Sequence, residues 1–309
     1  MVTGGAGFIG SNLVDRLLTL GNWVSVIDDL SSGREENLIN ASQHEKFNLV
    51  RGSVCDLTLL KQSCVGVDYV FHLAAIASVS KSLEEPIKSH EVNLTGALNV
   101  LVAARENRVK KVIFASSSAV YGDTPSLFKL ESHPPHPQSP YALSKLAAEQ
   151  YCNIFTQEYG LSTICLRYFN VYGPRQDQRS EYAAVIPRFI HLIMQNQSPI
   201  IYGDGTQIRD FIFVQDVVRA NILAAISSAN GIYNIGSGQR VTVNELTQLL
   251  VQLLEKPSLK PHHTRERPGD VKRSVSGGNK ALEIGFKTRL SLERGLIKTI
   301  QSANSKIKK

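Results

Sequence analysis

The sequence has no long hydrophobic run and few cysteines, and these two absences exclude several classes of protein. No apolar stretch approaches the ~20 residues that a membrane-spanning helix needs, and no signal peptide is predicted at Met1. The cysteines Cys55, Cys64, Cys152 and Cys165 are scattered without a Cys-x-x-Cys pair. This pattern predicts neither a zinc site nor a disulfide framework and is typical of a cytoplasmic protein with reduced thiols.

Clustered basic charge is also scarce. The 309 residues carry a formal net charge of +7, but the lysines and arginines are dispersed, and only the tail at 306–309 forms a cluster. A nucleic-acid interface is therefore not predicted, whereas an anionic small substrate together with a basic surface explains the excess. Loop acids such as Asp204 and Asp216 lack the spacing of a metal site, so no metal is predicted.

A glycine-rich turn stands at the start of the chain. Gly4, Gly7 and Gly10 precede a helical leucine pattern, and the next strand, predicted over 23–27, ends at Asp28. Strand, glycine turn, helix, strand and acid in this order indicate a dinucleotide site. The glycines let the backbone approach a pyrophosphate, and Asp28 would bind a ribose hydroxyl, which favours NAD over NADP; Arg34 nearby leaves that choice open. Since only three residues precede Gly4, the first strand is either short or begins upstream of Met1.

Strands and helices continue to alternate along the first half of the chain, which predicts a Rossmann-like, doubly wound parallel sheet. The predicted strands cover 46–51, 69–75, 111–116 and 162–168, and the predicted helices cover 57–63, 93–107 and 140–159. Beyond residue 168 the chain is richer in loops, with helices near 185–196, 214–227 and 243–254. We predict a cofactor domain of 1–168, rejoined by 212–236, and a smaller mixed α/β substrate domain of 169–211 and 237–309. Trp23 and the phenylalanines are predicted to be core.

One helix start combines two groups that could move a proton. Ser139 is a good N-cap and Pro140 suits the first helical position, so Tyr141 and Lys145 share a face one turn into the helix. The lysine ammonium and the positive end of the helix dipole should lower the pKa of the tyrosine from ~10. Tyr141 is thus a candidate general base or acid, although a Tyr-x-x-x-Lys pair alone also occurs by chance.

Taken together, the motifs of this chain resemble those of the extended short-chain dehydrogenase/reductases, and more narrowly of the UDP-hexose 4-epimerases. The resemblance runs from residue 1 to about residue 275. It rests on the segments 4–10, 28–33, 116–122, 141–145, 167–174, 203–211 and 267–270.

The resemblance implies a tightly bound NAD that is not consumed, and the catalytic residues Ser117, Tyr141 and Lys145. Ser117 is chosen because the family's hydroxyl lies four residues before the tyrosine of a Tyr-Gly pair, here Tyr121. The implied cofactor contacts, besides Tyr141 and Lys145, are Gly4, Gly7, Phe8, Ile9, Gly10, Asp28, Asp29, Leu30, Ser31, Ser32, Gly33, Asp56, Leu57, Leu73, Ala74, Ala75, Ala77 and Phe169.

The resemblance also implies a UDP-sugar substrate. Arg209 and Arg267 are predicted to bind the pyrophosphate, because guanidinium groups are bidentate donors, with surface salt bridges to Asp210 or Asp270 as the alternative. Asp56 could instead cap a helix, and His72 is predicted to be a core residue rather than a catalyst. The implied substrate contacts are Ser78, Ser117, Ser118, Tyr141, Asn170, Val185, Tyr202, Arg209, Arg267, Asp270 and Ser274.

Two positions bear on the choice of sugar. In the resembling family, the residue at Ser274 limits the space beside the sugar 2-substituent, and a small residue leaves room for an N-acetyl group. The segment 182–187 is similar to epimerases of acetylated hexosamines. The prediction is interconversion of UDP-GlcNAc and UDP-GalNAc, and also of UDP-Glc and UDP-Gal. The alternatives are a UDP-glucose 4-epimerase without preference for acetylated sugars, a UDP-glucuronate epimerase or 4-reductase, and an inactive NAD-sensing protein. A homodimer through the helices near 94–107 and 142–158 is expected.

Overall fold

The fold is organised around a seven-stranded parallel sheet. A computed structural model describes residues 1–177, 184–266 and 271–307, with the side chains of 305–307 excepted. The strand order β12-β7-β5-β4-β1-β2-β3 reverses direction between β1 and β4, which confirms the predicted doubly wound sheet. The strands are β1 (Val2–Thr3), β2 (Val24–Asp28), β3 (Phe47–Arg51), β4 (Tyr69–His72), β5 (Lys111–Ser117), β7 (Thr163–Tyr168) and β12 (Gly231–Ile235).

The shortest strand of this sheet, β1, lies inside it, between β4 and β2. In β1, Val2 pairs with Val26 on one side and with Phe71 on the other, and both residues of the strand are buried. Two residues are sufficient here because both neighbouring strands hold them in register. The carboxyl end of β1 therefore delivers the glycine turn directly to the edge where the strand order reverses.

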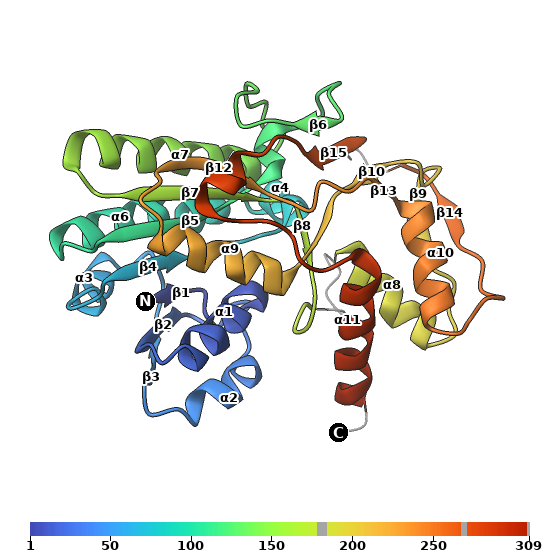
Figure 1. The fold of residues 1–309 in the computed structure, drawn as a ribbon, viewed down its shortest axis with the longest axis horizontal. Coiled ribbons are helices and arrows are strands. Elements are labelled where there is room, and N and C mark those ends of the chain that lie inside the picture. The colour runs from blue at the N-terminus through green and yellow to red at the C-terminus, as the bar shows by residue number, and fades with distance from the viewer. Residues whose placement is uncertain (178–183, 267–270, 308–309) are drawn as a thin grey trace.

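Helices cover both faces of the sheet (Figure 1). Helices α1 (Phe8–Thr19) and α9 (Val214–Ile226) pack together on one face, with α2 (Ile39–Ser42) beside them. The other face is covered by α3 (Leu57–Ser63), α6 (Gly96–Glu106) and α7 (Pro140–Tyr159), whose apolar residues form a separate core with the sheet. The segment 212–236, predicted to return to the sheet, supplies α9 and the edge strand β12, which pairs with β7.

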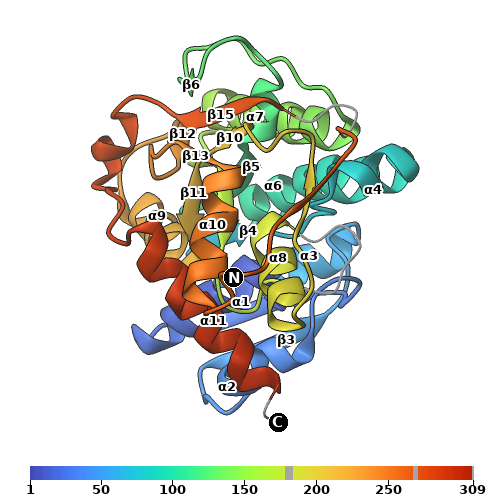
Figure 2. The same ribbon diagram turned by 90° about the vertical axis from the view of Figure 1, so that its right-hand side faces the viewer.

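A smaller lobe stands against the carboxyl ends of the strands (Figures 1 and 2). Its own core joins three helices to short strands through Phe189, Ile201, Phe211, Leu246 and Leu296. The helices are α8 (Val185–Met194), α10 (Val243–Leu253) and α11 (Leu292–Ile307). One sheet has the order β13-β10-β15-β6, made of Val241–Thr242, Ile208–Arg209, Arg273–Ser276 and Phe128–Lys129. Two further strand pairs are β8 (Asn170–Tyr172) with β11 (Phe211–Phe213), and β9 (Ile200–Tyr202) with β14 (His262–Thr264).

A buried carboxylate joins this lobe to the edge of the large sheet. Asp210 lies between β10 and β11 and is fully buried. Its carboxylate accepts hydrogen bonds from the Ser237 amide and hydroxyl at 2.7 and 2.5 Å, and from the amides of Gly238 and Ser276 at 2.9 and 3.0 Å. These donors replace the water that the charged group loses on burial. The predicted alternative, a salt bridge from Arg209 to this aspartate, is therefore replaced by backbone contacts.

Several local expectations need correction. Trp23 was predicted to be core, but its side chain is 77% exposed, because β2 begins at Val24 and Trp23 belongs to the turn after α1. Phe128, on the short strand β6, is also exposed. The strand predicted over 69–75 ends at His72, where the chain leaves the sheet. The helix predicted over 93–107 is α6 preceded by a π-helical turn at Glu91–Thr95.

His72 is a core residue, as predicted, and it should make stability depend on pH. Its ring is buried beneath the site, with Nδ1 2.7 Å from the Thr3 hydroxyl. Burial, with a smaller contribution from Lys145, lowers the pKa of His72 from 6.5 to about 3. Between these values the unfolded chain binds a proton that the folded chain does not, so stability falls as the pH falls.

We expect the free energy of unfolding to drop by roughly 2 kcal/mol for this residue between pH 6.5 and pH 5. Urea titrations across that range would measure it. A His72→Asn variant should lose this slope, whereas the same change at exposed His90 should retain it. Equal slopes in the wild type and the His72 variant would contradict the assignment.

Candidate functional site

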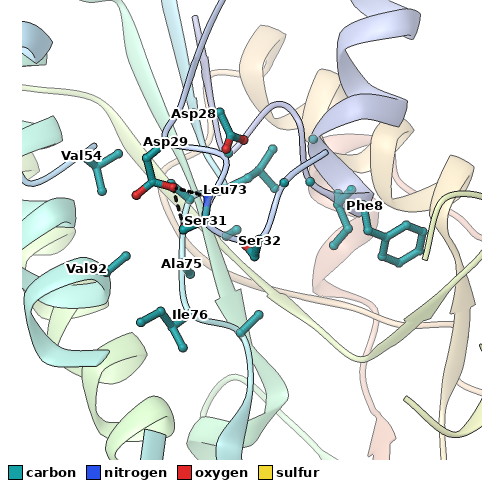
Figure 3. Close-up of a pocket in the computed structure, with 18 of the residues that line it drawn as sticks. Phe8, Asp28, Asp29, Ser31, Ser32, Val54, Leu73, Ala75, Ile76 and Val92 are labelled. Atoms are coloured by element: carbon teal, nitrogen blue, oxygen red, sulfur yellow. Dashed lines mark hydrogen bonds between the residues drawn. The ribbon is translucent and has the colours of Figure 1, made fainter. Parts of the chain in front are cut away.

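A pocket opens at the carboxyl ends of β1 and β4, where the strand order reverses (Figure 3). The turn after β1, the end of β2 and the loop after β4 line it, and the start of α7 closes it. All but four of the predicted cofactor contacts are among its lining residues. They are Gly4, Gly7, Phe8, Ile9, Gly10, Asp28, Asp29, Ser31, Ser32, Gly33, Leu73, Ala74, Ala75, Ala77, Tyr141 and Lys145.

The glycine spacing has a steric reason in this turn. Gly4 has φ +70°, and a Cβ there would lie 2.7 Å from the Ala74 amide nitrogen. A Cβ on Gly10 would collide with the Gly4 carbonyl oxygen. Gly7, the N-cap of α1, contributes no capping side chain, and the first turn of the helix holds no acidic residue. The helix N-terminus therefore faces the pocket with its positive dipole end, which suits a pyrophosphate.

Asp28 braces the same turn from the end of β2. It is buried, and its two carboxylate oxygens accept the amides of Ala6 at 2.8 Å and Leu30 at 2.9 Å. Burial raises the pKa of this carboxyl, while the two backbone hydrogen bonds oppose the rise. Asp29 accepts the amide and hydroxyl of Ser31 at 3.0 and 2.5 Å, as the dashed lines in Figure 3 show. Both acids thus present oxygen atoms at the predicted ribose end of the pocket.

Four predicted cofactor contacts do not line the pocket. Asp56 accepts the Leu59 amide at 2.9 Å as the N-cap of α3, which is the alternative weighed from the sequence, and Leu57 follows it in that helix. Leu30 donates its amide to Asp28, and Phe169 packs in a separate small cluster. The lining residues that the sequence did not single out are Ile27, Gly52, Val54, Ile76, Val92, Ala115, Ser116 and Tyr168.

The α7 start brings the predicted proton-transfer groups to this pocket. Ser139 caps the helix by accepting the Ala142 amide at 3.1 Å. One turn later the Lys145 ammonium donates to the Ala115 carbonyl at 2.8 Å and lies 4.8 Å from the centre of the Phe114 ring. Burial lowers the pKa of Lys145 to about 8, although nearby Glu149 raises it.

The Ser117 side chain lies next to the Tyr141 hydroxyl. Burial raises the pKa of Tyr141 above its usual value, and the nearby Ser117 lowers it by less. The predicted lowering of this pKa is therefore wrong for the protein alone, because the loss of water on burial is the dominant influence. The adjacent Ser116 hydroxyl is directed away from Tyr141, to Glu149 at 2.5 Å. Ser118 begins a 3₁₀ turn over Ser118–Tyr121.

A second pocket lies beside the first, in the smaller lobe, and gathers four predicted substrate contacts: Asn170, Val185, Tyr202 and Arg209. Arg188 donates to the Tyr202 hydroxyl at 3.3 Å, and Asn170 donates to the Asp210 carbonyl at 3.2 Å. The sequence did not single out the other polar residues of its lining, Tyr172, Gln176 and Gln207.

The remaining predicted substrate contacts have different places. Ser274 is buried on β15, in register with Arg209 on β10, although it does not line the second pocket. Ser78 caps α4 (Val79–Glu84) by accepting the Lys81 amide at 3.1 Å. Arg267 and Asp270, together with Tyr182 of the segment 182–187, lie outside the described residues.

The arrangement suits proton and hydride transfer on a small anionic substrate. Tyr141 and Lys145 line the first pocket, and Arg209 lines the pocket of the smaller lobe. Within the described ranges no cluster of three or more histidine, cysteine, aspartate or glutamate residues could hold a metal. None of the described helices is both long and apolar enough to cross a bilayer.

Comparisons with known proteins agree with this geometry. A model of the NAD dependent epimerase/dehydratase family matches residues 1–236. The chain is 38% identical to a UDP-glucose 4-epimerase of Mycolicibacterium smegmatis, over 99% of this chain and 98% of that protein. It also superposes on two solved structures. A UDP-N-acetylglucosamine 4-epimerase from Methanobrevibacter ruminantium, in complex with UDP-N-acetylmuramic acid, gives a TM-score of 0.95 at 44% identity, over 99% and 97% of the two chains. A UDP-glucose 4-epimerase of Thermotoga maritima with UDP-glucose gives 0.94 at 40% identity, over 99% and 98%.

The family and the NAD cofactor predicted from the motifs are thus confirmed. The match covers the glycine turn, Asp28 and the α7 pair, which are the features that shape the first pocket. This chain is an enzyme that belongs to the NAD dependent epimerase/dehydratase family.

Proposed function

We propose that the protein inverts C4 of a UDP-hexose through a transient 4-keto sugar. The observation that carries the proposal is the position of Tyr141 and Lys145, which line the pocket formed by the glycine turn, with the Ser117 side chain next to the tyrosine. Arg209 lines the pocket of the smaller lobe. The relatives and solved structures named above, all C4 epimerases of UDP-sugars, support it.

Each group has a physical role in the proposed cycle. Tyr141 takes the proton of the sugar 4-hydroxyl, and Ser117 holds that oxygen by a hydrogen bond. Lys145 keeps a positive charge one turn along the helix, which stabilises the phenolate as it forms. The glycine turn would hold NAD, which would supply the hydride acceptor and later the hydride donor for C4. Arg209 holds the substrate phosphates while the flat 4-keto sugar turns over and exposes its other face.

Dehydration and decarboxylation are the competing reactions within the family. Relatives that remove a proton from C5 or lose a carboxylate need additional acidic groups beside the serine. This chain has Ser118 and Ala119 at those positions, which supports plain epimerisation.

The acetylated pair UDP-GlcNAc and UDP-GalNAc is the proposed preferred substrate, with UDP-Glc and UDP-Gal also turned over. Ser274 is small and buried, and its strand pairs it with Arg209, which lines the second pocket. We expect a Ser274→Tyr variant to lose kcat/KM on UDP-GlcNAc by roughly 100-fold, as a clash in a packed site would predict, yet change less than about threefold on UDP-Glc. Steady-state kinetics on both sugars would measure this, and an equal loss on both would contradict the pocket assignment.

The direct test is incubation with UDP-Glc, UDP-GlcNAc, UDP-glucuronate and UDP-Gal, without added NAD, followed by separation of the products. We expect a C4 epimer to form from UDP-GlcNAc, UDP-Glc and UDP-Gal without added cofactor. This result would also show that the protein retains NAD and does not consume it. Conversion of UDP-glucuronate alone would support the uronate alternative. No epimer from any of the four would refute the proposal and favour an NAD-sensing role.

We further propose a cytoplasmic homodimer formed by the helices of the large sheet. Helices α4 and α5 (Pro86–His90) pack against α7, and the three helices expose large apolar side chains at Leu83, Ile87 and Leu143. This exposure supports the helices near 142–158 as one side of the interface. Sedimentation analysis should give twice the mass of one chain.

A further inference from the structure

A buried acid lies one turn beyond Lys145 on the same face of α7. Glu149 is 1% exposed, and its carboxylate accepts the Ser116 hydroxyl at 2.5 Å. It also accepts Nε and Nη2 of Arg167, on β7, at 2.8 and 2.6 Å. Three donors therefore satisfy this buried carboxylate.

The network continues away from the helix. The Arg167 guanidinium lies 4.7 Å from the centre of the Tyr121 ring, and the Tyr121 hydroxyl donates to Asn234, on β12, at 2.7 Å. Nη1 of Arg167 is buried without a hydrogen-bond partner, so the orientation of the guanidinium depends on the carboxylate and the ring. The strands β7 and β12 and the turn after β5 are thus all connected to Glu149.

The position of this acid relative to the proposed reacting groups is informative. Lys145 binds the carbonyl of Ala115, and Glu149 binds the side chain of Ser116, the next residue. The residue after that is Ser117, whose side chain lies next to Tyr141. Two successive turns of α7 are therefore attached to two successive residues of β5, immediately before the reacting serine.

We infer that Glu149 is a positioning residue: by bonding Ser116 and Arg167 it fixes the end of β5 against α7, and so fixes Ser117 relative to Tyr141 and Lys145. A buried ion pair is weak evidence for stability alone, because desolvation offsets most of its attraction. A role in fixing the position of β5 against α7 explains why the Glu149–Arg167 pair is present, which its small net contribution to stability does not. The inference rests on the proposed epimerase reaction.

The charge of Glu149 also acts on Lys145. It raises the pKa of that lysine against the lowering caused by burial. The other titratable groups near the ammonium are Cys152 of the same helix, Cys165 of β7 and His72 of β4. Of the groups that raise the pKa of Lys145, Glu149 has the largest effect.

A Glu149→Gln variant tests the inference, since glutamine retains the shape and loses the charge. We expect kcat to fall about 10- to 100-fold, as a misplaced catalytic hydroxyl would predict, while KM changes less than about threefold. The high-pH limb of the kcat profile should also move to lower pH, because Lys145 then loses its proton more easily. A role in stability alone would lower the melting temperature and leave both the pH limb and kcat per folded molecule unchanged.

A matched control is Glu158→Gln, which makes the same change on an exposed turn of the same helix and should alter neither kcat nor the pH profile. If Glu149→Gln does not fold, Ser116→Ala removes the hydroxyl bond while leaving the ion pair, and it should also lower kcat more than KM. Wild-type kcat and pH limb in a folded Glu149→Gln or Ser116→Ala variant would overturn the inference. A wild-type enzyme without C4 epimerase activity would instead overturn the proposed function.

Discussion

Replacing Tyr141 with phenylalanine is expected to lower kcat for C4 epimerisation by about 10³-fold, within the range that a positioned acid or base contributes. The change removes only the hydroxyl that lies next to Ser117, and the ring remains at the start of α7. Since burial raises the pKa of this hydroxyl, the residue is neutral in the protein alone. To act as the base it must first release its proton to solvent, and the positive charges of Lys145 and of bound oxidised NAD would favour that release. Rates would be measured with saturating UDP-sugar at pH 8.

Tyr159→Phe provides the control, because it removes the same atom from the exposed end of the same helix. It should leave kcat unchanged. NAD bound per chain, read from absorbance after denaturation, should be equal in the wild type and in Tyr159→Phe, and the same measurement on Tyr141→Phe separates loss of cofactor from loss of proton transfer. A Tyr141→Phe variant with more than about a third of wild-type kcat would show that another group transfers the proton.

Replacing Asp210 with alanine is expected to lower the free energy of unfolding by about 3–5 kcal/mol, as for the loss of a buried, fully bonded charge. The change leaves the Ser237, Gly238 and Ser276 donors without an acceptor in the interior. Urea denaturation followed by circular dichroism would measure the effect. Loss of the smaller lobe before the sheet would appear as a second transition.

Asp204→Ala serves as the matched control for that substitution. Asp204 also accepts an amide and a hydroxyl, both from Thr206, but it lies on an exposed turn. Its removal should cost less than about 1 kcal/mol, since water can replace the lost bonds. Similar decreases in the free energy of unfolding in the two variants would show that burial does not explain the contribution of Asp210 to stability.

The sequence was sufficient to predict the sheet, the family and most of the cofactor pocket, because those features depend on local patterns. Gly4, Gly7 and Gly10 have a steric reason within one turn, and Ser139 caps α7 from the adjacent residue. Strand ends of a parallel sheet meet at one edge, so residues placed at those ends by hydrophobic pattern were brought together.

The parts of the fold and of the two pockets that the sequence did not predict depend on contacts between distant segments. Val54 and Val92 approach the cofactor pocket only through packing of α3 and the turn before α6, and nothing in their own neighbourhood marks them. The pairing of Ser274 with Arg209 is set by a sheet of two- to four-residue strands, too short to give an alternating pattern. Trp23 was misplaced because a large apolar side chain next to a strand resembles a strand residue.

The predicted direction of the Tyr141 pKa shift was wrong for a different reason. The sequence shows the neighbouring charge at Lys145 but not the depth of burial, and burial determines the sign. The same limit applied to Asp210, whose sequence neighbour Arg209 suggested an ion pair. In the folded chain its donors come from residues that lie more than twenty positions away.

The route of the chain between the sheet and the smaller lobe limits how the two can move. The chain leaves the large sheet after β7, returns through β11 into α9 and β12, and leaves again after Ile235, while β8 and β11 run side by side at the crossing. A body attached at several points cannot swing about one bond, in contrast to two bodies joined by a single linker. We therefore expect access to the reacting groups to depend on loops, side chains and small hinge motions at these crossings, and not on free rotation of one lobe about a single linker.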